Sequence, residues 1–268
     1  MSGAEKAQRD GAARLVSAGA AMLSASVLLD SAMEHYRGSF RNKAMWLPLL
    51  SSAANLGVDG SGRGGGLRLV SHAAAGGIGS TGFGFHAWNV AKRPGGVRLV
   101  NLFYGAPIGA PGALVLAGAV GAVADGIRAD PPRIGPLPLG DGRALAGLLA
   151  FGIAGTVGEA GLLHFRGAFQ NPAMYLPVVL PPVAALSLAR DAWTGEPRGL
   201  TVGLLVATAV MGIAGVAFHA YGVGRNMGGW RNASQNLLAG PPLPAPPSFT
   251  GLAVAALGAL RLMRGRDG

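Results

Sequence analysis

The chain contains a succession of long apolar stretches, and this pattern restricts its fold more than any other feature. Only 13% of the 268 residues are Asp, Glu, Lys or Arg, about half the usual share in a soluble domain. An apolar helix of about 20 residues can cross a bilayer, where unpaired backbone is too costly for irregular structure. The sequence therefore predicts an all-α, polytopic integral membrane protein with about eight transmembrane helices. They are expected at 14–34, 44–58, 67–90, 108–126, 144–164, 173–190, 199–222 and 248–263.

The composition excludes several classes of site. The chain has no cysteine, which rules out disulfides, thiolate metal sites, iron–sulfur clusters and cysteine nucleophiles. No complete dinucleotide-binding, phosphate-binding or serine-hydrolase motif is present. The net charge of +10 is not concentrated in a basic helix or in a basic patch interleaved with aromatic residues. We therefore expect a lipid bilayer and no nucleic acid as partner.

An internal duplication organises the chain. Residues 35–48 (HYRGSFRNKAMWLP) and 164–177 (HFRGAFQNPAMYLP) are identical at nine of 14 positions without a gap. At the same offset Asp30 aligns with Glu159, and further on His86 aligns with His219. Each copy contains four predicted helices, so both copies should have the same orientation. The sequence thus predicts two parallel tandem four-helix repeats.

The duplication also sets the predicted boundaries, and the distribution of Lys and Arg predicts the orientation. The chain is expected in the inner (plasma) membrane. If its N-terminus is inside, 13 of the 22 basic residues lie in cytoplasmic segments, which favours a cytoplasmic location for both termini. The expected segments are a cytoplasmic tail at 1–13, the first repeat at 14–127, a Pro/Gly-rich cytoplasmic linker at 128–142, the second repeat at 143–263 and a cytoplasmic tail at 264–268.

Histidines and acids retained in both copies are the candidate site. Helical spans place the four histidines near the outer membrane face, with one acid per copy about 7.5 Å deeper at 1.5 Å per residue. Two histidines and one carboxylate per copy have the composition of a non-haem metal site for iron or copper, and two sets could build one dinuclear centre. The predicted ligands are His35, His86, His164, His219, Asp30 and Glu159.

One geometric difficulty and one alternative accompany this metal site. Five residues along a helix turn through about 500°, so Asp30 and His35 share a face only if His35 lies beyond the helix end. Otherwise the carboxylate would not bind the metal itself but would accept a hydrogen bond from a metal-binding histidine and so orient its ring. Paired histidines could instead ligate b-type haem, with Met45 and Met174 as weaker ligands.

Further polar residues retained in both copies are expected around the site, as anion-binding or ligand-orienting groups or simply as helix caps. They are Arg37, Arg166, Asn42, Asn171, Asn101 and Asn236. His72 has no histidine counterpart in the second copy and is expected to be structural.

Three functions remain open. The first is a membrane redox component, such as an oxidoreductase or a subunit of one, that exchanges electrons with quinone or a periplasmic redox protein. The second is a cation- or proton-coupled transporter of small solutes that uses Asp30 and Glu159. The third is an assembly scaffold of a larger membrane complex.

Overall fold

The structure, a computed structural model, describes residues 3–61, 65–129, 132–134, 137–138 and 142–264. The described chain is almost entirely helical, and a short antiparallel hairpin joins its two halves. The first half contains α1 (Gly3–Arg37), η1 (Lys43–Trp46), α2 (Leu47–Ser61), α3 (Gly66–Ala91), α4 (Leu99–Tyr104) and α5 (Gly109–Arg128). The hairpin is β1 (Arg133–Ile134) and β2 (Leu137–Pro138). The second half contains α6 (Arg143–Arg166), η2 (Pro172–Tyr175), α7 (Leu176–Thr194), α8 (Gly199–Gly224), η3 (Gly229–Asn232), α9 (Ala233–Ala239) and α10 (Pro247–Met263).

Each predicted apolar stretch contains a helix, although some boundaries differ. Helix α1 begins at Gly3, so most of the segment expected to be a tail is helical. The linker predicted at 128–142 includes the β1–β2 hairpin; residues 130–131, 135–136 and 139–141 of the linker region lie outside the described residues. The same is true of 265–268 in the predicted C-terminal tail.

Several helices are suited to a bilayer. Among the described residues, five helices are long and apolar enough to cross a membrane: α1, α5, α6, α7 with its preceding 3-10 turn, and α8. Helices α2 and α10 are shorter, with 15 and 17 residues. The apolar helices make the chain consistent with a helical membrane protein.

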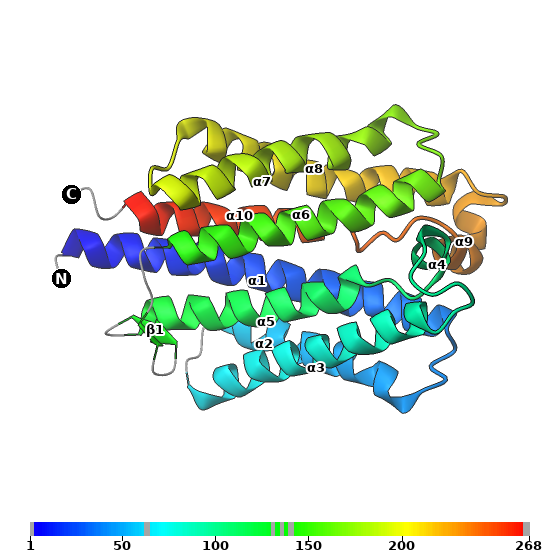
Figure 1. The fold of residues 1–268 in the computed structure, drawn as a ribbon, viewed down its shortest axis with the longest axis horizontal. Coiled ribbons are helices and arrows are strands. Elements are labelled where there is room, and N and C mark those ends of the chain that lie inside the picture. Colours follow the sequence, from blue (N-terminus) through cyan, green and yellow to red (C-terminus); the bar gives the residue numbers. More distant parts are fainter. Residues whose placement is uncertain (1–2, 62–64, 130–131, 135–136, 139–141, 265–268) are drawn as a thin grey trace.

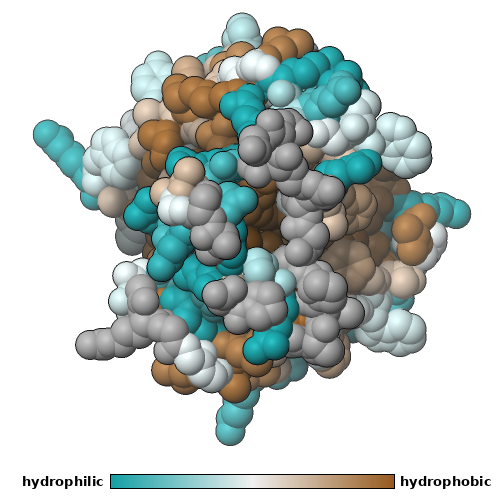
Figure 2. Space-filling model, turned by 90° about the vertical axis from the view of Figure 1, so that its left-hand side faces the viewer, coloured by the Kyte–Doolittle hydropathy of each residue, from teal (hydrophilic) through white to brown (hydrophobic). Residues whose placement is uncertain are grey.

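Each half forms a ring of four helices. Helix α1 packs against α2 and α5, and α3 packs against the same two helices, so α1 and α3 face each other diagonally. In the second half α7 and α10 both contact α6 and α8, which places α6 and α8 on the other diagonal. Both termini and the hairpin lie at one end, here called the terminal end, and α4 and α9 lie at the opposite loop end (Figure 1). Hydrophilic residues gather over the middle of the terminal end (Figure 2).

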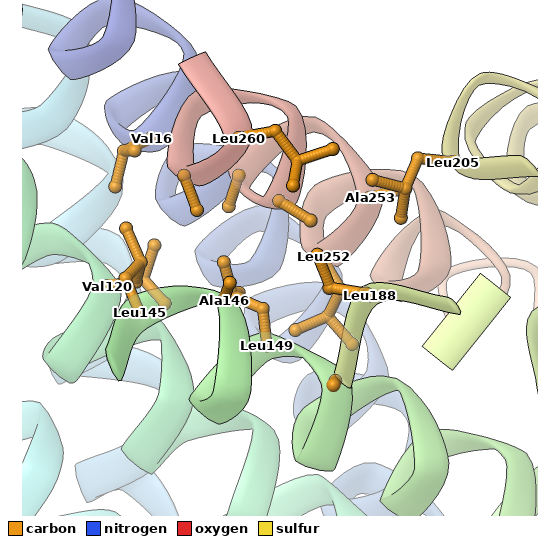
Figure 3. Close-up of a cluster of buried hydrophobic side chains, with 14 of the residues drawn as sticks. Val16, Val120, Leu145, Ala146, Leu149, Leu188, Leu205, Leu252, Ala253 and Leu260 are labelled. Atoms are coloured by element: carbon orange, nitrogen blue, oxygen red, sulfur yellow. The ribbon is translucent and has the colours of Figure 1, made fainter. Parts of the chain in front are cut away.

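The two halves share one apolar core, built mainly by α1, α5, α6 and α10. Figure 3 shows Val16, Val120, Leu149 and Leu252 converging from these four helices. Glycine allows α1 and α10 to approach closely: a Cβ on Gly19 would lie 2.5 Å from the carbonyl oxygen of Gly251. In lipid the hydrophobic effect does not drive helices together, so close packing through small residues at such crossings holds them in contact.

We expect Gly19→Val to destabilise the protein by about 1–3 kcal/mol, because the added atoms would overlap α10 and force the halves apart. The measurement is thermal unfolding in mild detergent. Gly155→Val is the matched control, since nothing lies within 4 Å of a Cβ at that position of α6. Equal unfolding temperatures for the two variants would contradict the close contact of α1 with α10.

Candidate functional site

Each of the four predicted histidine ligands lies in the last turns of a long helix at the loop end. His35 and His164 are two residues from the ends of α1 and α6, and His86 and His219 are five residues from the ends of α3 and α8. All four side chains are partly buried.

The Nδ1 atom of every one of these histidines contacts a backbone carbonyl of the following loop segment. His35 Nδ1 lies 2.6 Å from the oxygen of Met45, and His164 Nδ1 lies 2.8 Å from the oxygen of Met174. His86 and His219 make the corresponding contacts with the oxygens of Pro107 and Pro242. A carbonyl oxygen only accepts hydrogen bonds, so Nδ1 carries the proton. Nε2 is therefore the ring nitrogen that remains to bind a metal.

The histidines form one pair within each half. The ring centroids of His164 and His219 are 6.5 Å apart, with the ring planes at 68°. His35 and His86 lie close enough for their charges to interact. Each pair joins the two diagonal helices of one four-helix ring, which is where helical bundles commonly build cofactor sites.

The predicted three-ligand metal site does not assemble in this structure. Throughout the described residues, no three His, Cys, Asp or Glu side chains come close enough to hold one metal ion. The reason is visible in α1, which continues as one helix to Arg37. His35 is inside the helix, so Asp30 points away from it by the helical rotation that separates residues five apart.

Asp30 and Glu159 instead lie near each other, one in each half. They lie near enough to each other for their charges to interact, and the backbone N–H of Gly109 donates a hydrogen bond to Glu159. Gly109 is the first residue of α5, so the Glu159 carboxylate lies at the positive end of that helix. A Cβ on Gly109 would overlap Glu159 Oε2, so a larger residue at this position would displace the carboxylate from the helix end.

The retained arginines bind backbone carbonyls of the opposite half. Arg37 pairs with Glu34 and donates to the carbonyl oxygens of Leu237 and Gly240, each at 3.2 Å. Arg166 donates to the carbonyl oxygen of Phe103 at 3.1 Å, and its guanidinium lies 5.7 Å from the ring centroid of Tyr104. Both arginines therefore tie the halves together at α4 and α9.

The retained asparagines shape the loops that support the histidines. The Oδ1 atoms of Asn42 and Asn171 each accept a hydrogen bond at 2.9 Å from the backbone N–H two residues further along the chain. These bonds cap the 3-10 turns η1 and η2. Asn101 donates at 2.7 Å to the carbonyl oxygen of Gly96, and Asn236 donates at 2.8 Å to that of Gly229. These contacts match the capping role, which sequence alone left open beside anion binding.

The structure also reveals a buried ionic cluster that the sequence reasoning missed. Arg68 Nε lies 2.7 Å from Asp125 Oδ1, and its Nη2 lies 3.1 Å from Asp59 Oδ1. His72 Nε2 lies 3.2 Å from Asp125 Oδ2, and its ring packs against Gly121. Asp125 and Arg68 fall inside predicted spans, and an ionisable residue there signals an internal partner. Arg68 is only 4% exposed, as expected for a charged residue with an internal partner.

A smaller polar group occupies the corresponding part of the second half. Asp191 accepts hydrogen bonds from Thr201 Oγ1 at 2.5 Å and from the Arg198 side chain at 3.0 Å. Ser187 completes this group by sharing a hydrogen bond of 2.7 Å with Thr201. Each carboxylate oxygen of Asp191 has a partner, in contrast to Asp59.

No family model, curated protein or solved structure matches this chain. The function is therefore argued from the site.

Proposed function

We propose that the chain is a membrane electron-transfer protein in which the Nε2 atoms of each histidine pair ligate one b-type haem. In this proposal eight helices cross the inner membrane as two parallel four-helix repeats, so the chain holds two haems near its outer face. The observation that carries the proposal is the common arrangement of the four histidines: each Nδ1 contacts a backbone carbonyl, and the two histidines of each half come from diagonal helices and lie near each other.

The number of ligands favours haem over a bare metal ion. Protein-bound iron, copper and zinc sites mostly use three or more side chains, and the described part of the chain gathers no such group. Haem brings four ring nitrogens of its own, so two imidazoles complete six ligands. In the second half the residues that would hold the group are His164 and His219, whose ring centroids lie 6.5 Å apart.

The surroundings of the pairs support an exchange of electrons with a lipid-soluble partner. Phe85 and Trp88 flank His86 on α3 and are 59% and 65% exposed. Tyr221 follows His219 on α8 and is 61% exposed. Exposed aromatic rings at this level suit the membrane interface, where a quinone headgroup or a periplasmic redox protein could approach. A haem held here would change only between its ferric and ferrous states.

The test is purification in mild detergent from cells supplied with haem precursor. The visible spectrum should show a haem absorption band that shifts on reduction with dithionite, and iron analysis should match the haem content. A colourless protein that contains copper would mean that the same histidines bind copper and not haem. A colourless protein without any metal would overturn the redox proposal.

A second candidate, a proton- or cation-coupled transporter, is favoured by the proximity of Asp30 and Glu159, one in each half. Paired acids near a repeat axis are suited to bind a coupling ion. Transport would require Glu159, so Glu159→Gln should abolish solute uptake into proteoliposomes while the protein stays colourless. A haem spectrum that Glu159→Gln leaves unchanged would favour electron transfer instead.

A further inference from the structure

We propose that the first half, and not the second, encloses a hydrated proton route that runs from the ionic cluster at the terminal end along α1 and α2 as far as Ser31. This inference does not depend on haem binding. It rests on buried polar atoms of α1, α2 and α3 that have no partner among the described residues.

The route begins at Asp125, whose side chain is 27% exposed. His72 lies between this carboxylate and Asp59: its Nε2 is 3.2 Å from Asp125 Oδ2 and 3.7 Å from Asp59 Oδ1. The side chains of His72 and Asp59 are fully buried. A neutral Nε2 that faces both acids can accept the proton of the exposed carboxyl and give the same proton to the buried carboxylate, which restores the neutral imidazole.

Other charged groups surround this entrance without closing it. Arg68 contacts both carboxylates, and Arg128 Nη1 lies 3.3 Å from Asp125 Oδ1. Arg9 of α1 donates to the carbonyl oxygens of Ile127 and Ala129 at the end of α5. Two arginines, Arg68 and Arg128, thus face the two acids of the cluster.

Beyond the entrance, polar side chains follow the inner face of α2. Ser52, Asn55 and Asp59 lie one turn apart, and each is fully or almost fully buried. Ser71 on α3 donates to Asn55 Oδ1 at 2.6 Å. Within the described residues, Asp59 Oδ2, Asn55 Nδ2 and Ser52 Oγ have no hydrogen-bond partner.

A serine stripe on α1 continues the route. Ser17, Ser24 and Ser31 are seven residues apart, which places them on one face at intervals of about 10.5 Å. His35 follows one turn after Ser31 on the same face. Gly19 on α1 contacts α10, so the stripe is turned from α10 toward α2 and α5. All three serines are at most 6% exposed, and in the described structure Ser17 Oγ and Ser24 Oγ have no partner.

Buried polar atoms without partners are costly, and protein interiors usually satisfy them with ordered water. Six such atoms from three adjoining helices therefore indicate a file of internal water molecules: Ser17 Oγ, Ser24 Oγ, Ser52 Oγ, Asn55 Nδ2, Asp59 Oδ2 and His72 Nδ1. Water next to Asp59 and His72 can carry a proton along the bundle.

The second half has an apolar interior at the same places. When α1 is aligned with α6 and α2 with α7, each of these polar residues has an apolar residue as its counterpart. The same holds for His72 when α3 is aligned with α8. The residues aligned with Ser17, Ser24, Ser52, Asn55, Asp59 and His72 are Ala146, Ile153, Pro181, Ala184, Leu188 and Leu205. All six are buried. This difference confines the route to the first half.

The test is proton flux into proteoliposomes containing the full chain. A potassium gradient with valinomycin drives protons inward, and pyranine trapped inside reports the internal pH. We expect the wild-type rate to exceed that of empty vesicles and to fall at least tenfold in Asp59→Asn and in Ser24→Ile, which introduces the second-half residue. Thr208→Val is the matched control, because Thr208 is a buried hydroxyl of the second half that donates to the Leu204 carbonyl.

Three results would overturn the route: a wild-type rate equal to that of empty vesicles, unchanged flux in both variants, or an equal loss in the control. Water-edited solid-state NMR of the wild type gives a test that needs no variant. Magnetisation from water should reach Asn55 and His72 much faster than Leu188 and Leu205, and equal transfer would contradict internal water. Haem absorbance measured on the same vesicles separates failure of the route from failure of the redox proposal.

Discussion

Replacing His219 with alanine removes about half of the bound haem from the purified protein, because His219 completes only the pair of the second half with His164. His86→Ala removes the other half, and the double variant binds none. Haem content per chain, determined by absorbance of the pyridine complex against protein concentration, measures each loss.

His72→Leu is the control for these variants. His72 is a buried histidine that belongs to neither pair, and its aligned residue in the second half is Leu205, so leucine suits such a position. Its haem content should equal that of the wild type. Complete loss of haem from His219→Ala alone would instead mean that all four histidines serve one shared centre.

Arg68→Leu destabilises the protein by about 3–5 kcal/mol, because breaking a buried ion pair leaves a buried charge without compensation. Arg68 is 4% exposed, and the side chain of Asp59 beside it is fully buried. Unfolding by increasing SDS in mixed micelles, followed by circular dichroism, measures the change in free energy.

Arg128→Ala provides the comparison, since its side chain is 39% exposed and an exposed ion pair contributes about 0–1 kcal/mol. The double variant Arg68→Thr with Asp59→Leu carries the aligned residues Thr201 and Leu188 and should recover part of the lost stability. If Arg68→Leu is no less stable than Arg128→Ala, the buried cluster does not stabilise the first half.

The helices could be predicted well because long apolar stretches with few charges follow a simple rule. Eight apolar stretches all contain helices, and even the 15-residue α2 with Pro48 near its start forms one. Boundaries were less certain: charged residues such as Lys6 and Arg9 do not interrupt α1, which begins at Gly3. The β1–β2 hairpin has only two residues in each strand, too few for a recognisable pattern.

Parts of the site were harder to predict because they depend on helix rotation and loop contacts. The rule of 100° per residue anticipated that Asp30 and His35 diverge within a continuous helix, and α1 is continuous there. It could not show that Asp30 lies near Glu159, since their proximity depends on the packing of the two halves. The carbonyl contacts of the histidines depend on loops that contain Met45 and Pro107, whose conformation has no sequence signature.

The ionic cluster was predictable in principle. Asp125 lies within the predicted span 108–126, and Asp59 directly follows the span 44–58. Acids at the ends of both neighbouring spans can face His72, whereas the internal duplication alone does not single His72 out, because it has no histidine counterpart in the second copy. Partners for a buried charge therefore have to be sought across the whole half.

Titration of the haem-free protein with haem, followed by electron paramagnetic resonance of the saturated ferric form, tests the central claim most directly. The account predicts two haems per chain and a low-spin signal typical of two imidazole ligands, lost in stages as His219 and then His86 are replaced. Saturation without that signal, or no specific binding of haem, would contradict the claim that the paired histidines hold haem.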